Sequence, residues 1–190
     1  MKPEIESNII KSNRLNLKGL ELFWHYSPAI FFLILPITDL FLMIESKFKN
    51  DIEGFQRMIE GQELGWIFLI ISILVFFYKW TNLRFKEINL IASDKSFNEA
   101  IRKTAQQLEW KIIKETSNFL IAKSHHNLGS WGEHITIIKQ ENNILINSIC
   151  DPEERPAISS WGGNNKNIKC FIKNIKQFTK SNDSKSTPSK

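Results

Sequence analysis

Apolar residues are unevenly spread along the chain, and two apolar blocks stand out before residue 81. The first, residues 23–44, contains one acid, Asp39, and one histidine. The second, residues 64–80, has no charged residue before Lys79. A helix rises about 1.5 Å per residue, so the first block spans roughly 33 Å, enough for a hydrocarbon core of about 30 Å. The pattern predicts two transmembrane helices that form a hairpin.

A soluble core and a cleaved signal peptide both fit the apolar blocks less well. Helices in the core of a soluble protein seldom run through 15 uncharged residues, as residues 64–78 do. A cleaved signal peptide would be followed by small residues, whereas Glu45-Ser46-Lys47 follows the first block. We therefore expect both blocks to remain in the protein and to cross a membrane.

The basic residues near the two blocks predict an orientation. Segment 1–22 carries four Lys or Arg residues, and Lys79, Arg84 and Lys86 follow at the end of the second block. The intervening loop, residues 45–63, has three basic residues against five acids. Because cytoplasmic flanks are enriched in Lys and Arg, we expect both termini in the cytoplasm and the loop outside. The protein would then be a two-pass protein of the cytoplasmic membrane, which in bacteria is the inner membrane.

Residues 82–180 show short alternating periods instead of apolar blocks. A capping-box pattern, Ser96-x-x-Glu99, predicts a helix over about 96–109, and a second apolar stripe predicts a helix over Asn165–Thr179. Four β-like runs lie between these helices: Trp110–Glu115, Asn118–Ser124, His134–Lys139 and Asn143–Ile149. The sequence predicts a cytoplasmic α-β-β-β-β-α domain, whose antiparallel sheet is covered by helices. The polar tail, residues 181–190, is expected to be disordered.

A transmembrane hairpin followed by a small β-rich cytoplasmic domain is similar in layout to some bacterial membrane-anchored PH-like proteins. The likeness covers architecture alone, because four strands are predicted here rather than seven and no motif is shared. It implies an anchored domain and carries no activity to this chain.

Composition and charge sharpen this division of the chain. The 190 residues have a mean hydropathy of -0.23, an average that describes neither the apolar blocks nor the polar remainder. Two cysteines exclude a disulfide-stapled secreted scaffold. The net charge of +5 is concentrated in residues 163–190, which hold seven Lys and one acid, whereas the rest of the chain carries -1.

Five lysines of the last predicted helix form a lysine stripe with spacings of three and four residues. They are Lys166, Lys169, Lys173, Lys176 and Lys180. We interpret the stripe as a solvated helix face, with contact to anionic lipid headgroups as the alternative. Nucleic acid is not expected as a partner, because the stripe has no Arg and no neighbouring aromatic residue for stacking.

The tripeptide Ser-Trp-Gly occurs twice, at residues 130–132 and 160–162. Trp131 and Trp161 are therefore candidates for the walls of one pocket. Gly162 and Gly163 precede a predicted helix, whose first backbone N–H groups can bind an anion. Ordinary loop packing is the favoured interpretation of the repeat.

Asp39 is the candidate polar contact within the membrane. An acid inside a span can handle protons, contact another helix, reach the outer headgroups or bond a neighbouring hydroxyl such as Ser72 or Thr38. We favour the headgroup or hydroxyl contact, because a single acid in a two-helix hairpin does not make an ion pathway.

No pattern in the chain indicates a catalytic, metal or cofactor site. His125, His126, His134, Cys150 and Asp151 lack zinc-site spacing, and no phosphate-binding loop or nucleophile motif occurs. We therefore expect a non-enzymatic, membrane-anchored interaction or regulatory module with an unidentified protein partner. The alternatives are a small subunit of a larger membrane assembly that uses Asp39, or an enzyme or metal-dependent protein. The latter would use the Trp131/Trp161 loop end, with His126, His134 or Asp151.

Overall fold

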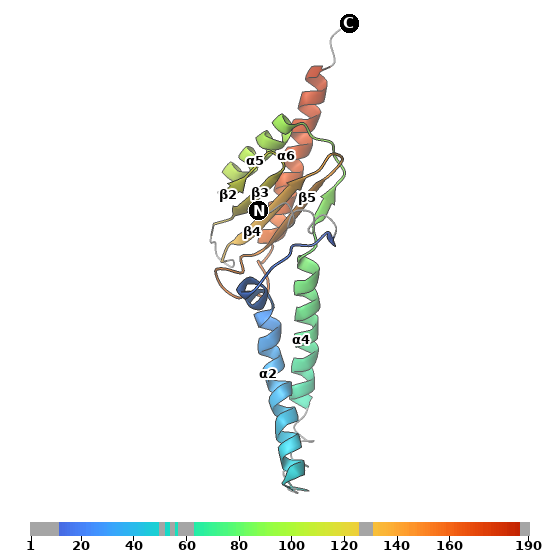
Figure 1. Ribbon diagram of the computed structural model, residues 1–190, viewed down its shortest axis with the longest axis vertical. Coiled ribbons are helices and arrows are strands. Elements are labelled where there is room, and N and C mark those ends of the chain that lie inside the picture. The colour runs from blue at the N-terminus through green and yellow to red at the C-terminus, as the bar shows by residue number, and fades with distance from the viewer. Residues whose placement is uncertain (1–11, 50–51, 54–55, 57–62, 126–130, 187–190) are drawn as a thin grey trace.

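Two long helices form the apolar hairpin: α2 (Leu20–Phe48) and α4 (Glu63–Asn82), which lie side by side (Figure 1). The computed structural model describes residues 12–49, 52–53, 56, 63–125 and 131–186. Both helices contain the apolar blocks expected from the sequence and extend beyond them at each end. Of the expected loop, 45–63, residues 50–51, 54–55 and 57–62 lie outside the described residues.

Two hydroxyl groups inside the apolar hairpin are satisfied by backbone carbonyls. Pro28 has no N–H for the Trp24 carbonyl four residues earlier, and the Ser27 hydroxyl donates to that carbonyl instead, at 2.9 Å. Ser72 of α4 donates across the hairpin to the Ala29 carbonyl at 2.8 Å. The helices therefore remain continuous and closely packed despite their prolines and hydroxyls.

The apolar side chains of the hairpin mostly face outward. Phe31, Phe41 and Leu74 are 67%, 64% and 63% exposed. Both helices are long and apolar enough to cross a membrane, and only 11% and 17% of their most apolar windows are buried. Helices of a soluble core would instead bury these side chains.

The polar part of the chain forms a mixed α+β unit around a five-stranded antiparallel sheet. The strands are β1 (Lys86–Ile88), β2 (Lys111–Glu115), β3 (Phe119–Lys123), β4 (Glu133–Lys139) and β5 (Ile144–Cys150), in the order β1-β5-β4-β3-β2. The predicted mixed fold and antiparallel sheet are confirmed, and each of the four expected strands lies within one residue of its expected bounds. The three-residue strand β1 was not expected, because it is too short to show an alternating pattern.

Helices α5 (Asp94–Leu108) and α6 (Gly163–Ser186) cover one face of the sheet (Figure 1). The N-cap of α5 is Ser93, whose hydroxyl accepts from the Ser96 N–H at 3.2 Å, so this helix starts two residues before its expected start. Helix α6 continues past Thr179 to Ser186, so the expectation of a disordered tail is wrong for residues 181–186. Residues 187–190 lie outside the described residues.

The other face of the sheet is covered by the chain on either side of the hairpin. Leu15 and Phe85 pack beside Phe119 and Leu145 of the sheet. The Leu15 N–H donates to the Leu83 carbonyl at 2.8 Å, so the segment before α2 runs beside the segment after α4. We call residues 83–186 the sheet domain. The described residues before α2 complete its second layer, although the sequence indicated only a cytoplasmic N-terminal segment.

Candidate functional site

The apolar hairpin is joined to the sheet domain by buried polar contacts at the end of α4. Lys79 is only 2% exposed, and its Nζ donates to the Ala157 carbonyl at 2.8 Å. His25 of α2 donates from Nε2 to the Lys79 carbonyl at 3.0 Å. The Arg14 guanidinium lies 3.7 Å from the centre of the Trp80 ring and donates to the Trp80 carbonyl at 3.0 Å. The Lys79 bond holds the loop after β5 against the last turn of α4, and the other two contacts join α2 and the segment before it to the same turn.

A polar cavity of about 270 Å³ lies at this junction, and we call it the junction cavity. Its walls come from the end of α4, the middle of β5, and the turn that leads into α6 with the start of that helix. Its polar lining includes Thr81, Asn82, Arg84, Ser159, Ser160 and Asn164. Arg84 is the charged residue among the described residues that line the cavity, and none of them is acidic.

Asn147 of β5 fixes one wall of the junction cavity. This side chain is buried, and its Nδ2 donates to the carbonyls of Asn82 and Arg84, each at 2.8 Å. Strand β1 pairs with Ile144, Leu145 and Ile146 of β5 and goes no further along that strand. The edge of β5 is therefore open at Asn147. At this open edge the Asn147 side-chain amide binds the segment between α4 and β1 through its backbone carbonyls. This contact places Arg84 at the cavity.

The opposite wall is formed by the turn that leads into α6. Ser159 accepts from the Trp161 N–H at 3.1 Å, and Ser160 accepts from the Asn164 N–H at 3.0 Å. Trp161 has a left-handed backbone with φ of 48°, and its side chain is 84% exposed. Gly162 lines the junction cavity. The turn therefore presents two serine hydroxyls to the cavity and an indole ring to the outside.

The buried side of the α6 N-terminus is already occupied by an acid of the protein itself. Glu133 is 2% exposed, and a Cβ at Gly163 would collide with its carboxylate. This carboxylate accepts from the Ser124 hydroxyl and, at 3.5 Å, from Asn167 Nδ2. The partial positive charge of a helix N-terminus favours such an anion. An external anion at Gly162 and Gly163 was the less favoured interpretation of this turn, and Gly163 instead makes room for Glu133.

The two Ser-Trp-Gly copies differ in their surroundings. The Trp131 ring lies 4.4 Å from the Arg155 guanidinium, whereas Trp161 is almost fully exposed. Neither ring lines the junction cavity, although Gly162 of the second copy does. The repeat located the right turn, but the cavity there is made by residues that the sequence did not single out.

His134 and Asp151, two residues of the metal and enzyme hypotheses, both lie beside Lys123. Lys123 pairs with His134 in register, and its Nζ lies 2.7 Å from Asp151 Oδ2 and 2.6 Å from Glu153 Oε2. Burial alone would lower the pKa of Lys123, but its hydrogen bonds to Asp151 and Glu153 raise that pKa above its usual value. Asp151 thus serves as an ion-pair partner.

The remaining candidates for metal or thiol chemistry are placed as follows. His126 lies outside the described residues, and within the described ranges no group of three His, Cys, Asp or Glu side chains is arranged to hold a metal. Cys150 and Cys170 are free thiols. Burial raises the pKa of Cys150, which makes it a poor nucleophile.

All five residues of the lysine stripe are exposed along α6. Helix α6 runs along the long axis of the molecule and ends far from the apolar hairpin (Figure 1). Lys166 and Lys180 are therefore about 21 Å apart along the helix axis. The stripe follows the direction of the hairpin, so a surface perpendicular to the hairpin cannot contact all five lysines together.

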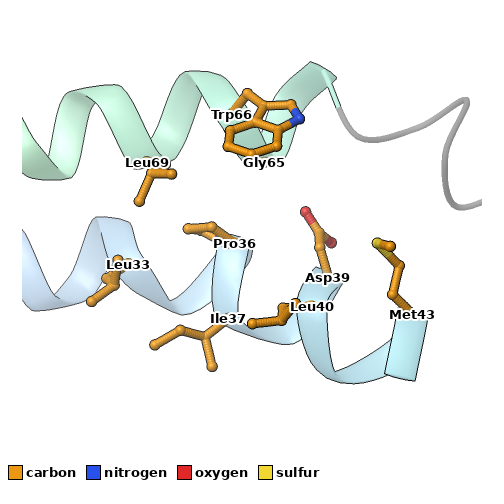
Figure 2. A pocket seen from close by; sticks show the side chains of 9 residues that line it. All are labelled: Leu33, Pro36, Ile37, Asp39, Leu40, Met43, Gly65, Trp66 and Leu69. Carbon is orange, nitrogen blue, oxygen red and sulfur yellow. The ribbon is translucent and has the colours of Figure 1, made fainter. Parts of the chain in front are cut away.

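Asp39 lies in a second cavity, of about 240 Å³, near the far end of the apolar hairpin (Figure 2). Its carboxylate points towards Gly65, where a Cβ would collide with it. Gly65 belongs to the first turn of α4, whose N–H groups have no partner within the helix and carry partial positive charge. Ser72 and Thr38, the expected partners, instead donate to backbone carbonyls. Asp39 is therefore stabilised by the facing helix end.

These features define a mixed α+β protein with two long apolar helices, an antiparallel five-stranded sheet and a polar cavity where the two parts meet. No protein-family model matches the chain, and no curated protein or solved structure matches it either. The similarity to PH-like proteins thus remains one of layout, and the sheet has five strands rather than seven.

Proposed function

We propose that this is a two-pass membrane protein whose apolar hairpin anchors the sheet domain at the cytoplasmic face. The observation that carries the proposal is the outward-facing apolar surface of α2 and α4, with Phe and Leu side chains more than half exposed. An apolar patch of this extent on a soluble protein would cause aggregation, whereas lipid chains solvate it. Trp66 lies near one end of α4 and Trp80 near the other, as in interfacial aromatic belts.

The anchored domain acts as a non-enzymatic interaction or regulatory module in this proposal. Two buried acids that could act in catalysis already have partners within the protein. Asp151 forms an ion pair with Lys123, and Glu133 accepts hydrogen bonds from Ser124 and Asn167. The alternative, a subunit that contacts a larger assembly through Asp39, has less support, because Asp39 already faces the N-terminus of α4.

Cysteine labelling of the full chain tests the anchor and its orientation. In a Cys170→Ser background, Lys49→Cys reports on the end of α2 and Lys111→Cys on the sheet domain; both positions are exposed. We expect a membrane-impermeant maleimide to label Lys49→Cys in intact spheroplasts and Lys111→Cys only after lysis. The protein should also resist carbonate extraction. Release into the soluble fraction would reject the anchor, and the reverse labelling pattern would reject the orientation alone.

A further inference from the structure

We propose that the junction cavity binds the phosphate group of an anionic membrane lipid, with Arg84 as its cationic ligand. The proposal rests on the membrane anchoring proposed above. The last turn of α4, with Tyr78 and Trp80, then lies at the headgroup level of the cytoplasmic leaflet. The cavity walls include that turn, so the cavity opens where lipid phosphates are found.

Among the described residues, the charge that lines the cavity is positive and no acid pairs with it. Arg84 is exposed, and its guanidinium lies 5.6 Å from the centre of the Trp80 ring. The Arg14 guanidinium also lies over this ring. No ion pair joins Arg14 or Arg84 to an acid within the described part of the chain. Glu133, the buried acid beside α6, bonds Ser124 and Asn167 and does not line the cavity. A guanidinium forms paired hydrogen bonds with phosphate oxygens, which suits this position.

Neutral donors complete the proposed phosphate site. The Ser159 and Ser160 hydroxyl oxygens each accept from a backbone N–H, which leaves both hydroxyl protons to donate into the cavity. The Asn164 side-chain oxygen Oδ1 accepts from the Ser148 hydroxyl at 3.2 Å, so the side-chain nitrogen Nδ2 also remains a donor. A volume of about 270 Å³ suits a phosphate and a short polar headgroup better than a large cofactor.

Trp161 supports a lipid as the source of the phosphate. This indole is 84% exposed to water, and its residue has a left-handed backbone, which is unfavourable for a large side chain. It lies between Ser160 and Gly162, both of which line the cavity. Indole rings favour the interface between headgroups and acyl chains, so Trp161 would insert beside the bound headgroup. This inference places the headgroup contact at the junction cavity instead of the lysine stripe.

Native mass spectrometry of the full chain in neutral detergent tests the site. We expect the protein to retain phosphatidylglycerol in preference to phosphatidylcholine. Arg84→Gln should weaken phosphatidylglycerol retention about tenfold, as expected for the loss of a charged hydrogen bond. Arg102→Gln, at an exposed position on α5, is the matched control and should behave as the parent protein. Arg84→Lys should restore part of the retention, and unfolding midpoints of all variants exclude a folding defect.

Inorganic phosphate, added in a separate arm, distinguishes the source of the ligand. Phosphatidylglycerol that is retained through Arg84 and is not displaced by inorganic phosphate supports a lipid site. Arg84-dependent binding of inorganic phosphate without a lipid preference overturns the lipid assignment in favour of a soluble phosphate. Retention that Arg84→Gln leaves unchanged overturns the site itself. If that happens while the protein still resists carbonate extraction, the anchoring proposal survives.

Discussion

The apolar hairpin and the sheet domain use the same residue types in opposite ways. Phe97 and Phe171 of the sheet domain are fully buried and contact each other edge to face, whereas Phe31 and Phe41 of the hairpin are mostly exposed. The domain buries one stripe of each helix against the sheet, but the hairpin helices are apolar on all sides and bury only the narrow seam between them. Apolar content therefore gives little information about stability until the surrounding solvent is specified.

The two regions nevertheless accommodate an acid in the same way, a half-buried Asp39 in the hairpin and a buried Glu133 in the sheet domain. Asp39 faces Gly65 in the first turn of α4, and Glu133 faces Gly163 in the first turn of α6. In each pair a glycine lets the carboxylate approach a helix N-terminus, whose partial positive charge favours it. Glu133 also has side-chain donors, whereas aliphatic and aromatic side chains surround Asp39 in its cavity. Both acids therefore face a helix N-terminus of the protein itself.

Phenylalanine truncation should separate the two regions most strongly. Phe171→Ala removes a fully buried ring and should lower the free energy of unfolding of the sheet domain by about 3–5 kcal/mol. Phe41→Ala removes an exposed ring, and the domain should keep its stability. Urea unfolding of the full chain in mild detergent, followed by hydrogen exchange of β4 and β5, measures both effects. Equal losses in the two variants would contradict the division between the regions.

Placing an acid on the outer face of the hairpin should come next in effect. Leu74 is 63% exposed, so Leu74→Asp would turn a carboxylate towards lipid and lower membrane insertion by about 2.5–3.5 kcal/mol at most. Asp39→Leu should leave insertion intact, because it removes an acid from the seam. Carbonate extraction and protease protection measure the inserted fraction. An insertion defect in Asp39→Leu would show that Asp39 is needed for more than the facing helix end.

The glycine at the start of α6 gives a test inside the sheet domain. Gly163→Ala should lower the free energy of unfolding by about 1–3 kcal/mol, because its Cβ would collide with the Glu133 carboxylate. The same substitution in a Glu133→Ala background should cost much less, since the collision partner is gone. A double-mutant cycle from urea unfolding measures the coupling. Additive effects would mean that Gly163 is required for another reason.

The sequence predicted the elements with strong periodic patterns and missed those made by tertiary contacts. The apolar helices and the strands β2 to β5 follow from runs of apolar or alternating residues. Strand β1 has three residues and forms only because β5 offers it an open edge. The cap of α5 also differed, since Ser93 and Ser96 are both serines and the pattern alone favoured the one followed by Glu99.

The junction cavity could not be predicted from the sequence, for a physical reason. Its walls come from three elements far apart in the chain, and Asn147 brings Arg84 to it through hydrogen bonds to backbone carbonyls. Such bonds leave no spacing pattern in the sequence. The Ser-Trp-Gly copy at residues 160–162 was the available signal, and it did mark one wall.

A smaller effect on the sheet domain should depend on pH. Burial lowers the pKa of His134, although the nearby charge of Asp151 partly opposes this, and Lys123, Glu21 and Glu153 also act on it. The unfolded chain therefore binds a proton more readily once the pH falls below about 6.5, the usual histidine value. The domain should lose stability as the pH falls from there towards the lowered pKa.

Replacing the histidine tests this source of pH dependence. In His134→Gln the unfolding free energy should fall less steeply below about pH 6.5 than in the parent protein, because the protonation difference is removed. His125→Gln, at an exposed position just after β3, is the matched control and should keep the parent slope. Urea unfolding at several pH values, read from hydrogen exchange of β4, confines the measurement to the sheet domain. An unchanged slope in His134→Gln would assign the acid sensitivity of the domain to other titratable groups.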